Sequence, residues 1–289
     1  MLLTQLAVAG IQTGMLYALT AAGFALIFGA TRVFHVAHGA TFILAGYAFL
    51  EAMQMGAHWA IASLVALTVA VAFGLFMDML VYRPIQKHEG SFFTVFVASF
   101  GAGIAMQALI QFFFGGGFAT ISLPLTRATE LLPGLYIAPV FWVALAVVLL
   151  VFAAITLFLE RTHAGLGLRA LSENPELLRA YGLSARRLSA LAFVLGSALA
   201  VPGAILTTVT TGIQPADGAH VMLVSLAATV VGGIGSIRGA ALAGLVLGLV
   251  ENLVVSVVDT QWSQAASFVM LFGFILFRPN GLMGRAGAR

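Results

Sequence analysis

Residues 160–187 read ERTHAGLGLRALSENPELLRAYGLSARR, and this segment is the most polar stretch of an otherwise apolar chain. The whole chain has 23 charged side chains, 13 Lys and Arg plus 10 Asp and Glu. This segment carries eight of them, and five of the eight are arginines. Each arginine in a bilayer core would cost roughly 2.5–3.5 kcal/mol, so the segment must lie in water. Arginine-rich short loops stay on the cytoplasmic side of a membrane, and we therefore expect residues 160–187 to form a cytoplasmic loop.

The composition of the whole chain indicates a membrane protein. Hydrophobic residues make up 61% and charged residues 8% of the 289 positions, and the mean hydropathy is +1.08. Soluble domains have roughly 45–50% apolar and about 25% charged residues. The length leaves room for about eight or nine helices of ~20 residues. We expect an all-α, polytopic transmembrane helix bundle of about 8–9 spans, in a single membrane domain over residues 1–289. Because cysteine is absent, thiol catalysis and thiolate metal sites are excluded.

The apolar runs define the expected spans. These runs are 2–28, 40–53, 57–81, 91–114, 137–159, 188–211, 220–231, 240–258 and 263–277. With residues 160–187 inside, Arg127 is the only one of the 13 Lys and Arg residues that faces outward. This threading predicts nine passes, an outside N-terminus, a turn at 259–262 and a cytoplasmic C-terminal tail with Arg285 and Arg289.

The cytoplasmic loop should contain a helix of its own. Asn174 is a good N-cap and Pro175 suits the first helical position. Glu176 favours the positive end of the helix dipole, and Gly182 supplies the stop.

One face of this loop helix should be apolar, because Leu177, Leu178 and Tyr181 cluster on it. The face could pack onto the membrane helices of its own chain, or it could dock into a partner protein. If it docks, Leu178→Asp should weaken partner binding and leave membrane insertion intact.

Two polar breaks, 29–39 and 232–239, interrupt the apolar runs in the two halves of the chain. Glycine-interrupted membrane segments in both halves point to a translocation pathway in many transporters. The residues expected to line the pathway are His35, His38, Gly39, Gly233, Gly235 and Ser236. The two histidines could instead cap the following helix. A metal site is disfavoured because no third ligand is near them in sequence, and an intramembrane serine protease is disfavoured because Ser236 lacks a convincing histidine partner.

Other charged residues leave two readings open. Glu51 and Glu251 lie near the ends of their apolar runs, so they are expected to be exposed; buried carboxylates would indicate function. An autonomous channel or ion-coupled transporter would use these carboxylates and the two histidines as ion or proton sites. Asp78 should pair with Arg83 at a membrane boundary.

The chain has no Gly-x-x-x-x-Gly-Lys-Ser/Thr motif, so any ATP hydrolysis must take place in another chain.

An ordered set of motifs from about residue 10 to 284 resembles the permeases of branched-chain amino acid ABC importers of the LivH-like type. The motifs are 17–29 (YALTAAGFALIFG), Ala37-His38-Gly39, Gly46-Tyr47, Arg83-Pro84, Arg161-Thr162 with Gly165, Arg169-Ala170, Gly182-Leu183, Phe193 with Gly196, 232–236 (GGIGS), Gly239-Ala240, Gly248 with Glu251, and 278–282 (RPNGL). The chain departs from the family pattern at His35, where asparagine is usual, and at Arg238, where proline is common. Relatives of this type also take amides, urea or aromatic acids.

This resemblance implies a bacterial inner-membrane subunit that binds no cofactor itself and no nucleic acid. The implied partners are a second, similar permease, two cytoplasmic ATPase subunits that use ATP, a periplasmic substrate-binding protein that docks near Gln214 and Asp217, and membrane lipid. The resemblance also implies that the loop helix is a coupling helix that enters a groove on an ATPase. Its residues are Glu173, Asn174, Pro175, Glu176, Leu177, Leu178, Arg179, Tyr181 and Gly182.

Overall fold

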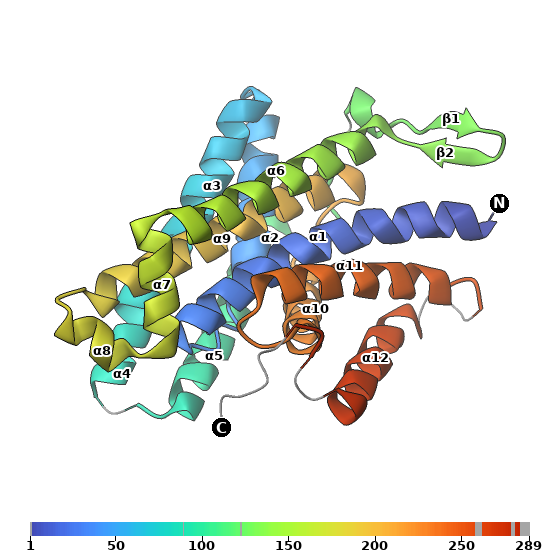
Figure 1. The fold of residues 1–289 in the computed structure, drawn as a ribbon. Coiled ribbons are helices and arrows are strands. Elements are labelled where there is room, and N and C mark those ends of the chain that lie inside the picture. The colour runs from blue at the N-terminus through green and yellow to red at the C-terminus, as the bar shows by residue number, and fades with distance from the viewer. Residues whose placement is uncertain (1, 89, 122, 258–261, 279–280, 284–289) are drawn as a thin grey trace.

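The structure is a computed structural model that describes residues 2–88, 90–121, 123–257, 262–278 and 281–283. Helices form nearly all of it, packed around α1 (Figure 1). In chain order the elements are α1 (Leu2–Thr31), α2 (His38–Gln54), α3 (Trp59–Phe76), the π-helix η1 (Met77–Tyr82), α4 (Arg83–Lys87), α5 (Phe92–Phe114), the 3-10 helix η2 (Pro124–Thr126), β1 (Thr129–Leu132), β2 (Leu135–Ile137), α6 (Pro139–Arg161), α7 (His163–Glu173), α8 (Pro175–Ala180), α9 (Ala185–Thr210), α10 (Asp217–Gly232), α11 (Ile237–Val254) and α12 (Ser263–Phe277). The expected turn at 259–262 lies mostly outside the described residues, and Arg285 and Arg289 lie wholly outside them.

The all-α membrane bundle is confirmed. Six helical stretches in the described residues are long and apolar enough to cross a membrane: α1, α3 continued to Lys87, α5, α6, α9 and α11. The helices α2, α10 and α12 have 17, 16 and 15 residues and fall short of the ~20 that a full crossing needs. The expected 8–9 spans are therefore an approximate count.

Helix α1 is the centre of the bundle. It packs against α11, α9, α10, α6 and α7, and it runs between α6 and α11 (Figure 1). Small residues make the contact with α11 close: a Cβ built on Gly14 would lie 2.6 Å from the carbonyl oxygen of Leu245, and one built on Gly244 would lie 2.7 Å from the backbone nitrogen of Ala18. Close backbone approach through small residues is how helices associate in lipid, where apolar side chains gain little from leaving the solvent.

Helices α2 and α10 both begin inside the bundle. The His38 ring bonds the carbonyl oxygen of Thr20, eleven residues before the end of α1, with an N···O distance of 3.0 Å. At a rise of 1.5 Å per residue the start of α2 therefore lies roughly 16 Å below that end. The first turn of α10 is at the same level, because a Cβ on Gly218 would lie 2.9 Å from the carbonyl oxygen of Gly39. The N-termini of α2 and α10 thus lie side by side within the bundle, beside the middle of α1.

The two ends of the bundle differ in chemistry. The N-terminus and the antiparallel β1–β2 hairpin lie at one end, which we call the hairpin end, and α4, α7 and α8 lie at the other, which we call the loop end (Figure 1). Gln5 fastens the hairpin to α1, since its amide donates to the carbonyl oxygen of Tyr136 over 2.9 Å. At the loop end Arg83 and Asp78 form the expected ion pair, and Ser189 donates to the same carboxylate over 2.8 Å.

Candidate functional site

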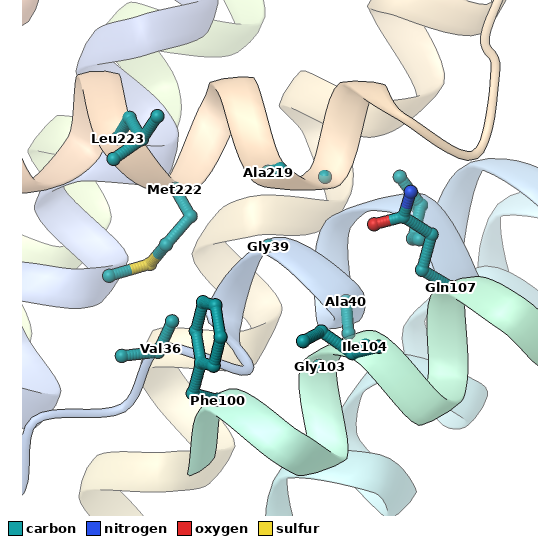
Figure 2. A pocket seen from close by; sticks show the side chains of 12 residues that line it. Val36, Gly39, Ala40, Phe100, Gly103, Ile104, Gln107, Ala219, Met222 and Leu223 are labelled. Atoms are coloured by element: carbon teal, nitrogen blue, oxygen red, sulfur yellow. The ribbon is translucent and has the colours of Figure 1, made fainter. Parts of the chain in front are cut away.

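A mostly apolar pocket opens where α2 and α10 begin, and α5 forms its third wall (Figure 2). Its cavity volume is about 150 Å³. The residues that line it are Val36, Gly39, Ala40, Ile43, Phe100, Gly103, Ile104, Gln107, Gly218, Ala219, Met222 and Leu223. The Gln107 amide is the polar side chain of the lining, and it lies at the opposite end of the pocket from Phe100 and Met222 (Figure 2).

Two helix N-termini border this pocket, and neither α2 nor α10 has a side-chain cap at its N-cap residue. Helix N-termini carry partial positive charge, which favours an anionic group nearby. The carboxylate of Asp217, in the first turn of α10, offsets this positive charge, and the N–H groups of His38 and Gly39 at the start of α2 already donate to the carbonyl oxygens of His35 and Val36. The pocket is therefore an apolar site with the Gln107 amide at one end, and it suits the aliphatic part of a small solute.

Of the residues predicted for the first break, Gly39 alone lines the pocket. His35 and His38 are fully buried in the protein instead. The His35 ring lies 2.7 Å from the Tyr82 hydroxyl, which donates to Ser99 Oγ over 2.7 Å. The alternative that the histidines cap α2 is wrong, because its N-cap is Ala37 and the cap has no side-chain bond. One ring nitrogen of each histidine thus holds the break, His35 against η1 and His38 against α1, whereas Nε2 of His35 and Nδ1 of His38 are buried without a partner among the described residues.

The second break lines a different and larger cavity, of about 890 Å³, at the loop end. Gly235 and Ser236 line this cavity, and Gly233 is buried beside Gly281. The two breaks meet at this cavity, because Gly29, Ala30 and Arg32 of the first break also line it, and a Cβ on Gly29 would lie 3.2 Å from the Cα of Gly235. The two breaks therefore share the loop-end cavity, whereas only the first break reaches the pocket at α2, α5 and α10.

Glu251 is buried, contrary to the expectation of an exposed carboxylate. Its Oε1 lies 3.9 Å from Nε2 of His220, and that ring nitrogen lies 2.9 Å from the Tyr17 hydroxyl. The cluster joins α11, α10 and α1, so long-range packing accounts for the burial. Glu51 is only half-buried. No three His, Asp or Glu side chains gather as a metal site within the described residues.

The loop helix forms as its sequence predicts. In α8 the Asn174 side chain accepts hydrogen bonds from the backbone N–H groups of Glu176 and Leu177 at 3.0 and 2.9 Å, and Pro175 is the first helical residue. Gly182 ends the helix with φ of +77°. Sequence reasoning missed α7, although Thr162 caps it by accepting from the N–H of Gly165 over 3.0 Å. The signal for this helix in the sequence was a threonine three residues before the N–H group that it caps. The glycines that follow the threonine obscured this signal.

The apolar face of α8 is split in two. Leu178 is buried, with 3% of its surface exposed, whereas Leu177 and Tyr181 are 54% and 78% exposed. Successive helical residues are rotated by 100°, so Leu178 turns inward while Leu177 and Tyr181, four residues apart, share the outer side. The packing reading therefore holds for Leu178, whereas the exposed Leu177 and Tyr181 remain available to a partner. Glu173, Glu176 and Arg179 lie on or beside it, and of these Glu176 and Arg179 are in the first and last turns.

We expect Leu178→Ala to loosen α8 from its own chain. Burial of a leucine side chain typically contributes about 2–5 kcal/mol relative to alanine. Because Leu178 packs within its own chain, Leu178→Asp would disturb α8 as well as any docking surface, and it does not test docking by itself. Limited proteolysis should cut residues 160–187 of Leu178→Ala faster than those of the wild type. Leu177→Ala is the matched control and should be cut at the wild-type rate, because that side chain packs against little.

Comparisons with known proteins agree with this architecture. The chain is 29% identical to the high-affinity branched-chain amino acid transport system permease protein BraD of Pseudomonas aeruginosa, over 96% of this chain and 94% of that protein. It is 28% identical to the LivH permease protein of Escherichia coli K12, over 96% and 94% of the two chains, and 24% identical to a probable LivH of Methanocaldococcus jannaschii, over 93% and 89%. A solved structure of PsaBC from Streptococcus pneumoniae in complex with Fab has a TM-score of 0.55 and 12% identity over 94% of this chain and 91% of that chain, which shows a shared fold.

The family described as "Branched-chain amino acid transport system / permease component" matches residues 6–277, which include both breaks, the pocket and the loop helices. A match of this extent covers the spanning helices except for the first four residues of α1, and it leaves only the ends of the chain outside it. The chain therefore belongs to the family of permease components of branched-chain amino acid transport systems.

Proposed function

We propose that this chain is a permease subunit of an ATP-driven importer that carries branched-chain or similar apolar amino acids into the cytoplasm. The pocket at the starts of α2 and α10 carries this proposal. Its wall is apolar, as an aliphatic side chain requires, and the Gln107 amide supplies one polar group at its end. A cavity of about 150 Å³ is comparable to those that hold benzene in protein interiors, and is thus wide enough for an isobutyl group.

The pocket also favours amino acids over the other solutes that such permeases take. Urea and small amides need several hydrogen-bonding partners, because a buried polar group without one costs about 1–3 kcal/mol. Gln107 is the only side chain of this lining that can supply such partners, so an aliphatic solute fits better.

The orientation follows from the positive-inside rule. Arg83, Lys87 and the arginines of residues 160–187 belong to the loop end, which would face the cytoplasm. Gly281 lies in the last turn that the structure describes, and it packs against Gly233 at the loop end. This contact supports a cytoplasmic C-terminus for a protein of the inner membrane. The hairpin end would then receive solute from a binding protein.

The proposed assembly has two permease subunits, two ATPase subunits and a periplasmic binding protein. ATP would be used by the ATPase subunits, since this chain has neither a P-loop sequence nor any lysine besides Lys87. The exposed Leu177 and Tyr181 would enter a groove on an ATPase. Helix α7 would then transmit the movement of the ATPase to α1, α6 and α9, because it contacts all three helices. A channel or ion-coupled transporter is disfavoured by membership of this family.

Filling the pocket should change which solutes pass. Ala219 is exposed on its wall, so Ala219→Leu should narrow it without disturbing the fold. When a pocket loses room for a methyl or methylene group, its discrimination between solutes that differ by that group changes by roughly 10–200-fold. We expect uptake of L-leucine to fall at least about tenfold relative to that of L-alanine in proteoliposomes that hold the assembled transporter, ATP and binding protein.

The matched control is Ala72→Leu, since Ala72 is an exposed alanine on α3 that does not line the pocket. It should transport like the wild type. Equal loss of both solutes in Ala219→Leu would contradict a side-chain site here, and ATP-independent uptake by this chain alone would contradict the importer itself.

A further inference from the structure

The large cavity at the loop end has a second kind of chemistry. It lies between α6 and α7 on one side and the start of α11 on the other, with α1 as its floor. The pocket at α2, α5 and α10 shares no lining residue with it. Its deeper wall is apolar and comes from the membrane parts of the helices: Ala25, Leu26, Phe152 and Ile155. Its rim is polar and charged, so the cavity is amphipathic along its depth.

Three arginines from three separate parts of the chain line this cavity. Arg32 follows α1, Arg169 belongs to α7 and Arg238 to the first turn of α11. Arg238 is paired with Glu160, whereas Arg32 and Arg169 make no ion pair within the part of the chain that the structure describes. Glu173 also lines the cavity. The lining thus holds three arginines against two glutamates, and the start of α11 adds the positive end of a helix dipole.

Arg32 occupies this position in an unusual backbone conformation. Its φ is +58°, and it is the one non-glycine residue with positive φ among the described residues. Helices commonly end in this left-handed conformation, but glycine is the usual residue there because it has no Cβ. Strained backbone of this kind is concentrated at functional sites. The placement of an arginine instead of a glycine brings a guanidinium to the rim of the cavity.

We infer that this cavity binds an anionic phospholipid of the cytoplasmic leaflet, with its phosphate at Arg32 and Arg169 and the upper part of its acyl chains against the apolar floor. Basic pockets between membrane helices on the cytoplasmic side suit lipid headgroups, and arginine recognises phosphate with two parallel hydrogen bonds. A freely dissolved phosphate would use the rim alone and leave the apolar floor in contact with water. The inference rests on the orientation proposed above, but its test needs no transport.

A bound lipid would also connect moving parts. Arg169 lies on α7, next to the proposed coupling helix α8, and Arg32 lies at the end of the central helix α1. A phosphate held by both would tie the loop to the bundle.

The test compares lipid retention by the purified full chain, measured by native mass spectrometry in detergent during titration with phosphatidylglycerol or phosphatidylcholine. The double variant is Arg32→Gln with Arg169→Gln; both side chains are exposed, so the fold should persist. We expect the wild type to prefer phosphatidylglycerol and the double variant to bind it about 25-fold more weakly, roughly fivefold for each arginine. Arg186→Gln with Arg187→Gln is the control; it removes two exposed arginines of the same loop that do not line the cavity, and it should bind like the wild type.

Three results would overturn the inference: equal binding of the two lipids by the wild type, undiminished phosphatidylglycerol binding by the double variant, or the same loss in the control. Inorganic phosphate at millimolar concentration distinguishes the source of the anion. It should displace little lipid, and full displacement would assign the rim to a soluble anion instead. If the double variant is not monodisperse, Arg169→Gln alone should still show the roughly fivefold loss.

Discussion

Gly244→Leu should prevent most of this chain from reaching its folded state. A Cβ at Gly244 would lie 2.7 Å from the backbone nitrogen of Ala18 and 2.9 Å from its Cα, and these backbone atoms belong to the most buried helix of the bundle. A side chain there must push α11 away from α1, which separates the helix pair with the most extensive contact among the described residues. Overpacking typically costs about 1–3 kcal/mol and more where backbone must move, which is a large part of a stability of about 5–15 kcal/mol.

The measurement is the monodisperse fraction of detergent-extracted protein in size-exclusion chromatography, together with its thermal stability. Gly101→Leu is the control, because a Cβ at Gly101 on α5 has no heavy atom within 4 Å. It should behave like the wild type. A monodisperse Gly244→Leu variant with unchanged thermal stability would mean that α1 and α11 do not pack as described.

Leu177→Asp combined with Tyr181→Asp should abolish transport while the membrane domain stays folded. Both side chains are exposed on the outer side of α8, so the fold does not need them. Apolar and aromatic anchors in a protein interface commonly contribute about 2 kcal/mol or more each, and a carboxylate in their place would be desolvated without a partner. We expect co-purification of the cognate ATPase subunits and ATP-dependent uptake to fall at least about tenfold.

Leu131→Asp with Tyr136→Asp is the matched control, since it makes the same changes at exposed residues of the β-hairpin, at the opposite end of the bundle. ATPase co-purification should be unaffected in that control. Normal ATPase binding by the α8 variant would show that this helix is not the docking element, even if the chain remains a permease.

The sequence predicted the fold class because the relevant energies are local. The length of an apolar run decides whether it can cross the membrane, whatever the other helices do. The charges of residues 160–187 likewise exclude that segment from hydrocarbon in any arrangement. The cap at Asn174 and the stop at Gly182 were predicted for the same reason, since each depends on a few adjacent residues.

The candidate site was predicted only in part. Gly39 was found because a glycine between two apolar runs is visible in the chain itself. Phe100 and Gln107 were missed because nothing in the sequence distinguishes the face of α5 that meets α2 from the faces that do not. His35 and His38 looked like pathway residues because buried polar side chains and pathway-lining ones have the same sequence signature.

By itself, then, the sequence determined that this is a membrane bundle, that residues 160–187 are too charged to lie in hydrocarbon, and where α8 begins and ends. Tertiary structure alone decided that Leu178 turns inward while Leu177 stays exposed, that Glu251 is buried beside His220, and that Gly39 meets Gly218. The physical reason is the range of the interactions. Solvation and capping act within a few residues, whereas packing depends on partners that are distant in the chain and meet only when the bundle closes.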